Sequence, residues 1–156
     1  KLMAHALANI LAKLGKEVAL NLVYDAAVRG GNIRAEIVYS DEPIAVPFFE
    51  EADIGLQLSK TLDPTVHARL VLIESSACDA ECKKCELRCP ASDRIPFEKL
   101  AVEQFSSPIF VNMIALGRLL SKIGINIETV NFAAEFPSQF LGENVKAIRY
   151  GYTYKD

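Results

Sequence analysis

The sequence has 156 residues, of which 51% are hydrophobic and 24% charged, a composition typical of a folded domain rather than a disordered or fibrous chain. Its net charge is −3, and no basic stripe is interleaved with aromatics, which argues against a nucleic-acid partner. The longest apolar stretch, 108–125, is interrupted by Asn112, Arg118 and Lys122, so we expect no helix that spans a membrane.

The first half of the sequence predicts one helix followed by four strands. Apolar residues recur at helical spacing over 2–14, and Gly15 is a natural C-terminal stop. The apolar run 17–23 is typical of a buried strand. The alternation over 33–39 predicts a second strand, whose better-buried face carries Ile33, Ala35, Ile37 and Tyr39. Between them, 24–32 is a loop with paired glycines, and the runs 53–58 and 69–74 have the length of further strands.

The second half predicts a loop and then mainly helices. The loop covers 75–94, and the helices are expected at 96–105, 107–122, 128–136 and 143–149. Ser107 and Pro108 are suited to the start of a helix. Near-continuous apolar strands with amphipathic helices favour an α/β fold with a mostly parallel sheet and flanking helices. No linker or internal repeat is visible, so a single domain over 1–156 is expected.

The four cysteines lie close together and form a candidate metal site. Their spacing is C-x3-C-x2-C-x3-C-P, formed by Cys78, Cys82, Cys85 and Cys89. The last three follow a bacterial ferredoxin run, although the first gap is one residue too long, and four thiolates also suit zinc. An intact helix would spread them over roughly 16 Å, so metal binding requires a looped segment. A zinc ion or an iron–sulfur cluster is favoured over disulfides or free thiols, and the spacing does not separate zinc from a cluster. Such clustering is more typical of a cytoplasmic protein than of a secreted disulfide framework.

Five segments match one protein family in their order and spacing. They are LGKEV after the first helix, YDAAVRGGNIRA at 24–35, Pro43-Ile44 with Ala52-Asp53, NMIALG at 112–117 and NVKAIRYGY at 144–152. Together they resemble the gamma subunit family of 2-oxoacid:acceptor (ferredoxin) oxidoreductases. Two features differ from that family's pattern. The glycine-rich turn that precedes the first helix in the family is missing here, and the cysteine-rich segment at about 75–94 looks like an insertion.

The resemblance implies a Rossmann-like open sheet and a role in a multisubunit enzyme. Such complexes oxidatively decarboxylate a 2-oxoacid, transfer the acyl group to coenzyme A and pass electrons to ferredoxin. The resemblance implies alpha, beta and delta subunits as partners, and thiamine diphosphate and [4Fe–4S] clusters bound mainly by those partners. We therefore expect this chain to be inactive alone and to support the active site and subunit assembly.

The loop after the first strand is the candidate site for a substrate, cofactor or subunit contact. It contains Tyr24, Arg29, Gly30, Gly31 and Asn32. Adjacent glycines allow the backbone to approach a ligand closely, and a guanidinium can bind a carboxylate or phosphate in a bidentate manner. The alternative is an ordinary turn with a solvated arginine. The resemblance makes the two interpretations about equally strong.

Asn112 is a second candidate for a subunit contact. It lies at the margin of the apolar arc formed by Leu116, Leu119 and Ile123. A structural hydrogen bond to a neighbouring loop is the simpler interpretation, because a buried amide needs partners.

Two other functions remain as alternatives to the oxidoreductase subunit. The chain could be a Rossmann-like metal-binding or redox-sensing adaptor that catalyses no reaction, with the cysteine insertion as its sensor. A weaker option is a nucleotide-binding protein whose phosphate loop precedes Lys1.

Overall fold

The computed structural model describes residues 1–24, 33–59, 67–77 and 92–155. The chain divides into two compact units. The first comprises Lys1–Phe48 and Glu128–Leu141, and the second comprises Phe49–Ile127 and Gly142–Asp156. Neither unit is therefore one continuous stretch of sequence.

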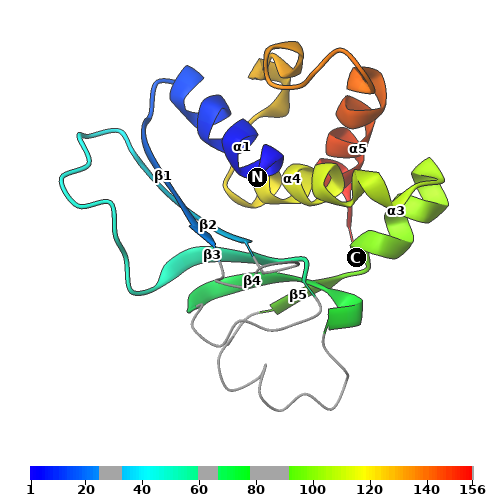
Figure 1. The fold of residues 1–156 in the computed structure, drawn as a ribbon, viewed down its shortest axis with the longest axis horizontal. Helices are drawn as coiled ribbons and strands as arrows, with labels where there is room; N and C mark the ends of the chain where they lie inside the picture. Colours follow the sequence, from blue (N-terminus) through cyan, green and yellow to red (C-terminus); the bar gives the residue numbers. More distant parts are fainter. Residues whose placement is uncertain (25–32, 60–66, 78–91, 156) are drawn as a thin grey trace. The chain divides into compact units, whose positions relative to one another are not determined.

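The first unit is built on a helix and a β-hairpin (Figure 1). Helix α1 (Leu2–Lys13) buries the apolar side predicted by its periodicity, including Leu7, Ile10 and Leu11. Gly15, with a φ of +84°, ends the helix in a conformation that favours glycine. Strands β1 (Glu17–Tyr24) and β2 (Ile33–Ser40) pair antiparallel, and α1 contacts both.

The hairpin is less buried than its sequence predicts. Strand β1 contains only half-buried and exposed residues, because a sheet of two strands covers little of its own surface. On β2 the expected inner face is wrong. Ile33 and Tyr39 are 50% and 41% exposed, whereas Arg34 and Glu36 are partly buried and form an ion pair at 2.9 Å. Apolar alternation identifies two faces of a strand, but it does not say which face the rest of the chain covers.

Two short turns occur where a helix over 128–136 was predicted. They are 3-10 turns, η3 (Ile127–Thr129) and η4 (Phe132–Ala134). Asn131 lies between them with a φ of −86° and a ψ of +84°, which is outside the helical region and prevents one continuous helix. The side chain of Glu135 follows, is only 1% exposed and forms an ion pair with Lys13 at the end of α1.

The second unit contains a parallel sheet of three strands. Its order is β3 (Ala52–Gln57), β4 (Ala68–Glu74) and β5 (Ser92–Ile95). The central strand β4 contributes most of the buried side chains, among them Val71, Leu72 and Ile73. Strand β5 lies within the predicted loop 75–94. Its sequence, SDRI, has no apolar pattern, and only its pairing with β4 makes it a strand.

The helices of the second unit agree with the predicted ones, with shifted ends. They are α3 (Phe97–Phe105), α4 (Val111–Lys122) and α5 (Leu141–Thr153), which extends past its predicted end at Arg149. The predicted helix 107–122 begins instead with a 3-10 turn, η2 (Pro108–Phe110), where the Ser107 hydroxyl accepts a hydrogen bond from the Ile109 amide. None of the described helices is long and apolar enough to span a membrane.

Helices α4 and α5 cross with their backbones in contact. A Cβ atom added at Gly117 would lie 1.9 Å from the Ile148 carbonyl oxygen, and one at Gly151 would lie 1.9 Å from the Ile114 carbonyl oxygen. Only glycine allows this approach. The NMIALG segment therefore ends on a residue that the packing of the second unit requires.

The α/β class, with a parallel sheet and flanking helices, is confirmed. The parallel arrangement holds for β3, β4 and β5. The pair β1–β2 is a separate antiparallel sheet among the described strands.

Candidate functional site

The end of the hairpin holds the two residues that flank the candidate loop. Tyr24 is the last residue of β1 and pairs with Ile33, the first residue of β2. The Tyr24 ring is 53% exposed, and the Lys1 ammonium lies 4.6 Å from its centroid, a cation–π contact. Arg29, Gly30, Gly31 and Asn32 lie outside the described residues. The structure therefore shows an exposed aromatic ring with an adjacent cation where the chain enters this loop.

Asn112 lies in the first turn of α4 and is exposed. Its amide makes no hydrogen bond to the described part of the chain, although the side chain of Leu116, one turn later, is completely buried. An exposed amide can hydrogen-bond to water, so the cost of burying it does not arise. The position leaves this side chain accessible to another molecule.

Cys78, Cys82, Cys85 and Cys89 also lie outside the described residues. The structure shows where their segment leaves β4 and where it returns in β5. It begins with a 3-10 turn, η1 (Ser75–Ala77), and ends at Ser92. Over residues 1–24, 33–59, 67–77 and 92–155, no three or more His, Cys, Asp or Glu side chains are grouped so that they could hold a metal ion.

A buried carboxylate fixes the start of this segment. Glu74, at the C-terminal end of β4, is only 2% exposed. Its Oε2 accepts a hydrogen bond of 2.9 Å from the Glu98 amide, in the first turn of α3, where the helix dipole favours negative charge. Its Oε1 accepts from the Ser76 amide at 3.1 Å and from the Ser75 hydroxyl at 3.3 Å. Glu74 thus joins β4, η1 and α3.

A second charged group fixes the end of the segment. Asp93 on β5 pairs with Arg118 at 2.8 Å and with Lys122 at 2.9 Å, both from α4. The side chains of Asp93 and Arg118 are 15% and 11% exposed. Arg118 also donates a hydrogen bond of 2.6 Å to the Tyr154 carbonyl oxygen, which ties the end of the chain to the same cluster.

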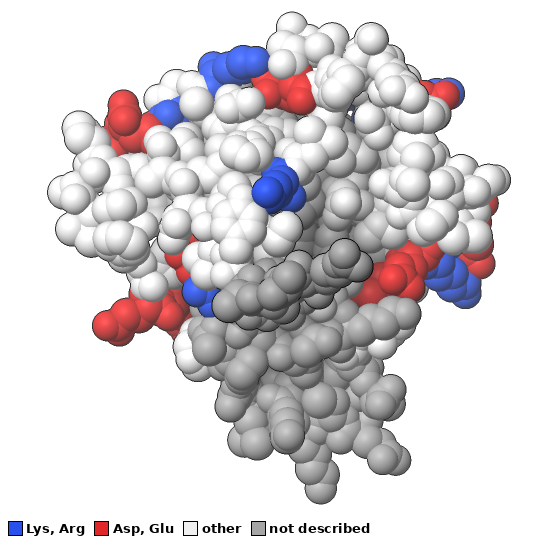
Figure 2. Space-filling model, in the orientation of Figure 1, with Lys and Arg blue, Asp and Glu red and all other residues white. Residues whose placement is uncertain are grey.

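The sequence interpretation does not single out Glu74 or Asp93. For Glu74, the sequence signal of a structural role is a carboxylate at the end of an apolar strand, followed by two serines. Asp93 has no comparable signal, because its partners are 25 and 29 residues away in the sequence. Among the described residues on the face drawn in Figure 2, Lys and Arg occur singly or beside Asp and Glu.

Nearly the whole chain matches one protein family. The model of the pyruvate ferredoxin/flavodoxin oxidoreductase family matches residues 1–154. The chain belongs to this family. The resemblance to the gamma subunit family of 2-oxoacid:acceptor oxidoreductases is thereby confirmed.

Two curated relatives in this oxidoreductase family carry the same name. One is the 2-oxoglutarate synthase subunit KorC of Archaeoglobus fulgidus, which is 30% identical over 154 residues, spanning 94% of this chain and 76% of that protein. The other is the KorC subunit of Methanocaldococcus jannaschii, which is 31% identical over 113 residues, spanning 67% of this chain and 57% of that protein.

Two solved structures have a similar fold. The pyruvate oxidoreductase subunit PORC of Thermotoga maritima has a TM-score of 0.66 and 22% identity, over 96% of this chain and 86% of the other. The gamma subunit of a keto/oxoacid ferredoxin oxidoreductase from Geobacter sulfurreducens has a TM-score of 0.68 and 19% identity, over 97% and 86%. At these identities the similarity supports the α/β fold and not a particular substrate.

Proposed function

We propose that this chain is the gamma-type subunit of a thiamine-dependent 2-oxoacid:ferredoxin oxidoreductase, with residues 1–156 as one gamma-type domain. The observation that carries the proposal is the family match across residues 1–154. The two curated relatives support it, because each is named as a subunit of 2-oxoglutarate synthase. The partners in this proposal are the alpha, beta and delta subunits, with ferredoxin as electron acceptor, in the cytoplasm.

In the proposed reaction, the bond between the carboxylate and the carbonyl carbon of the 2-oxoacid breaks and carbon dioxide leaves. The acyl group forms a thioester with coenzyme A, whose thiol proton is released, and the two electrons pass one at a time to ferredoxin. Thiamine diphosphate, held by the partner subunits, would supply the electron sink that decarboxylation needs. In this proposal the chain contributes binding surface rather than reacting groups.

The candidate loop gives the chain a direct way to contribute. Tyr24 places an exposed aromatic ring, with the Lys1 ammonium over it, at the point where the chain enters the loop. Arg29 supplies a guanidinium that could pair with a carboxylate or phosphate, and Gly30 and Gly31 allow close backbone approach. We propose that these residues, with Asn32 and the exposed Asn112, contact a partner subunit or a ligand that it holds.

Copurification followed by an activity assay tests the proposed function. The native chain is purified anaerobically and its bound proteins are identified. The assembly is then assayed for coenzyme A-dependent reduction of ferredoxin with 2-oxoglutarate and with pyruvate. We expect thiamine-binding subunits to copurify and one of these 2-oxoacids to support turnover. An assembly without such subunits, or one inactive with every 2-oxoacid tested, would contradict the proposal.

We also propose that Cys78, Cys82, Cys85 and Cys89 bind a zinc ion or an iron–sulfur cluster. Four thiolates suit either, and the nearby Lys83, Lys84 and Arg88 would help to keep the thiols deprotonated. Metal analysis and visible absorption of anaerobically purified protein distinguish zinc from a cluster. Replacing Cys85 with serine should lower the metal content. Four freely titratable thiols in metal-free protein from the same preparation would show that the cysteines hold no metal.

A further inference from the structure

The connection between β2 and β3 leaves apolar side chains exposed. Residues 41–51 form neither helix nor strand. Within them Val46 is 67% exposed, Phe48 is 72% exposed and Phe49 is 42% exposed. Single exposed apolar residues are ordinary on a protein surface. Several of them within four consecutive positions, two of them aromatic, form a local apolar patch of the kind that marks an interaction site.

Carboxylates flank this patch in the sequence, and two of them form no ion pair with the residues that the structure describes. The sequence from Asp41 to Asp53 contains five acidic residues and no Lys or Arg. Asp41 pairs with Lys16 at 2.6 Å, and Arg69 pairs with Glu51 at 3.1 Å and Asp53 at 3.3 Å.

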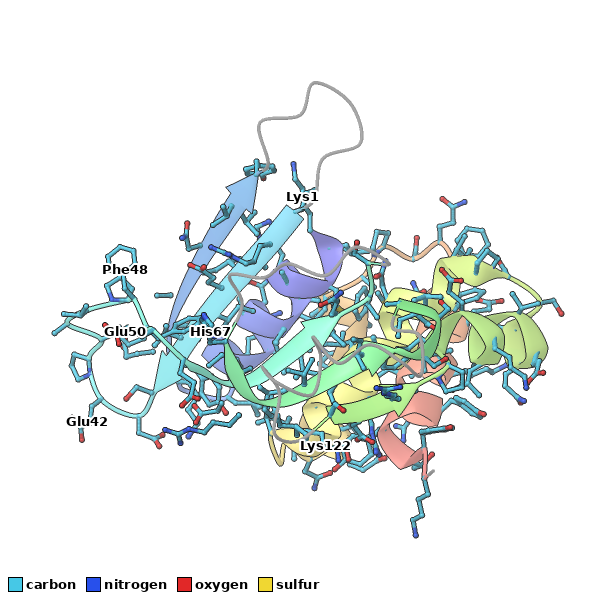
Figure 3. All side chains as sticks on the ribbon, turned by 90° about the horizontal axis from the view of Figure 1, so that it is seen from below. Lys1, Glu42, Phe48, Glu50, His67 and Lys122 are labelled. Atoms are coloured by element: carbon cyan, nitrogen blue, oxygen red, sulfur yellow. The ribbon has the colours of Figure 1, made fainter. Side chains whose placement is uncertain are left out.

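The other two acidic residues are Glu42 and Glu50. They are exposed and form no ion pair with the part of the chain that the structure describes. Figure 3 labels both on this connection, together with Phe48. The apolar patch therefore lies between two uncompensated negative charges along the chain.

We propose that residues 42–50 are a docking segment for another protein subunit, with Val46 and Phe48 as its anchors. The matching surface would be an apolar pocket for these side chains, rimmed by Lys or Arg that pair with Glu42 and Glu50. Buried aromatic anchors commonly provide most of the binding energy of an interface, and complementary charges at the rim speed association. The inference rests on the proposed function, because its partner is a subunit of the same complex.

The chemistry of the segment argues for a basic protein surface over other partners. Anionic membranes would repel Glu42 and Glu50. If this segment packed against its own copy across a two-fold axis, like charges would lie opposite one another. Pro43 and Pro47 restrict the free conformations of the segment, which lowers the entropy lost when it becomes ordered on a partner.

A double variant tests the anchors. The full chain with Val46→Ser and Phe48→Ser is titrated with the subunits that copurify with the wild-type chain. We expect Kd to rise by about thirtyfold or more, which is the effect of losing a strong interface anchor. The unfolding midpoint of the isolated variant should not change, because both side chains are exposed.

A matched control replaces exposed apolar residues elsewhere. Val102 on α3 and Ile109 in η2 are 51% and 60% exposed, so the pair Val102→Ser and Ile109→Ser removes similar exposed surface. This control should bind like the wild type. An unchanged Kd for the Val46/Phe48 variant, or an equal loss in both double variants, would overturn the docking segment.

The rim charges are tested by the association rate. Stopped-flow measurements should show slower association for Glu42→Lys and a weaker dependence on salt than in the wild type. Glu103→Lys, at an exposed position of α3, should associate like the wild type. If Glu42→Lys associates as fast as the wild type at low salt, the proposal of a basic rim on the partner surface is contradicted.

The outcomes separate this inference from the proposed function. If the wild-type chain binds thiamine-carrying subunits and the Val46/Phe48 variant binds them equally well, only the docking segment fails. If the wild-type chain binds no such subunits, the proposed function itself fails. If the wild-type chain dimerises and the variant is a monomer, the occupant is a second copy, and the proposal is overturned.

Discussion

Replacing Gly117 with alanine should destabilise the second unit by steric overlap at the crossing of α4 and α5. The added Cβ would lie 1.9 Å from the Ile148 carbonyl oxygen, whereas such carbon–oxygen contacts normally begin near about 3.3 Å. The helices would have to separate by roughly 1.4 Å. Because the atoms nearest to the added Cβ belong to the backbone of α5, no flexible side chain can move aside to relieve the overlap.

The expected magnitude follows from two opposing effects. Overpacking of a close-packed interior costs about 1–3 kcal/mol, and a clash with backbone falls at the upper end or beyond. Alanine favours a helix over glycine by up to about 1 kcal/mol. The net loss of unfolding free energy is therefore about 2 kcal/mol or more. For a chain of this length, that lowers the unfolding midpoint by roughly 4–8 °C.

Thermal and urea unfolding followed by circular dichroism would measure this loss. Gly142→Ala is the matched control, because a Cβ at Gly142 in α5 meets no atom within 4 Å. It should leave stability unchanged or raise it slightly. If Gly117→Ala were as stable as Gly142→Ala, the backbone contact between the helices would not be as close as described.

Three further predictions concern charged side chains. Glu74→Gln should lower the unfolding free energy by about 1–3 kcal/mol, because an amide cannot accept all the hydrogen bonds that the buried carboxylate accepts; an unchanged urea midpoint would refute this. Asp93→Asn should lower the unfolding free energy by about 1.5–3 kcal/mol, because it weakens the pairing with Arg118 and Lys122. Arg69→Gln breaks only exposed pairs and should leave the urea midpoint unchanged. Equal effects of the two substitutions would contradict the difference in burial. Arg29→Ala should lower turnover of the assembled complex by about tenfold or more without altering the unfolding midpoint. If the guanidinium binds in a bidentate manner, Arg29→Lys should keep only part of the wild-type turnover. Full activity in the alanine variant would remove Arg29 from the site.

Local patterns were sufficient to predict most elements of the fold. Apolar periodicity and a following glycine predicted α1, and short apolar runs predicted β3 and β4. Where the pattern was weak, tertiary pairing decided the structure. Strand β5 contains only one apolar residue in SDRI and exists because it pairs with β4.

For the candidate site, the sequence motifs support the family, and the structure describes only part of the predicted residues. The order of five motifs was enough to indicate the family, which the match over residues 1–154 confirms. The candidate loop and the cysteine cluster remain predictions, since Arg29 to Asn32 and Cys78 to Cys89 lie outside the described residues. Tyr24, at the end of β1, is the member of the candidate loop that the structure places, and it is exposed.

By itself, the sequence determined the α/β class and the helices and strands whose periodicity is strong, because these depend on residue types close together in the chain. It also indicated the family, through the order and spacing of five motifs. The tertiary structure decided which face of β2 is covered, how Glu74 joins β4 to α3 and why Gly117 and Gly151 must be glycine. Each of these depends on atoms brought together from distant positions, and local periodicity carries no information about such contacts.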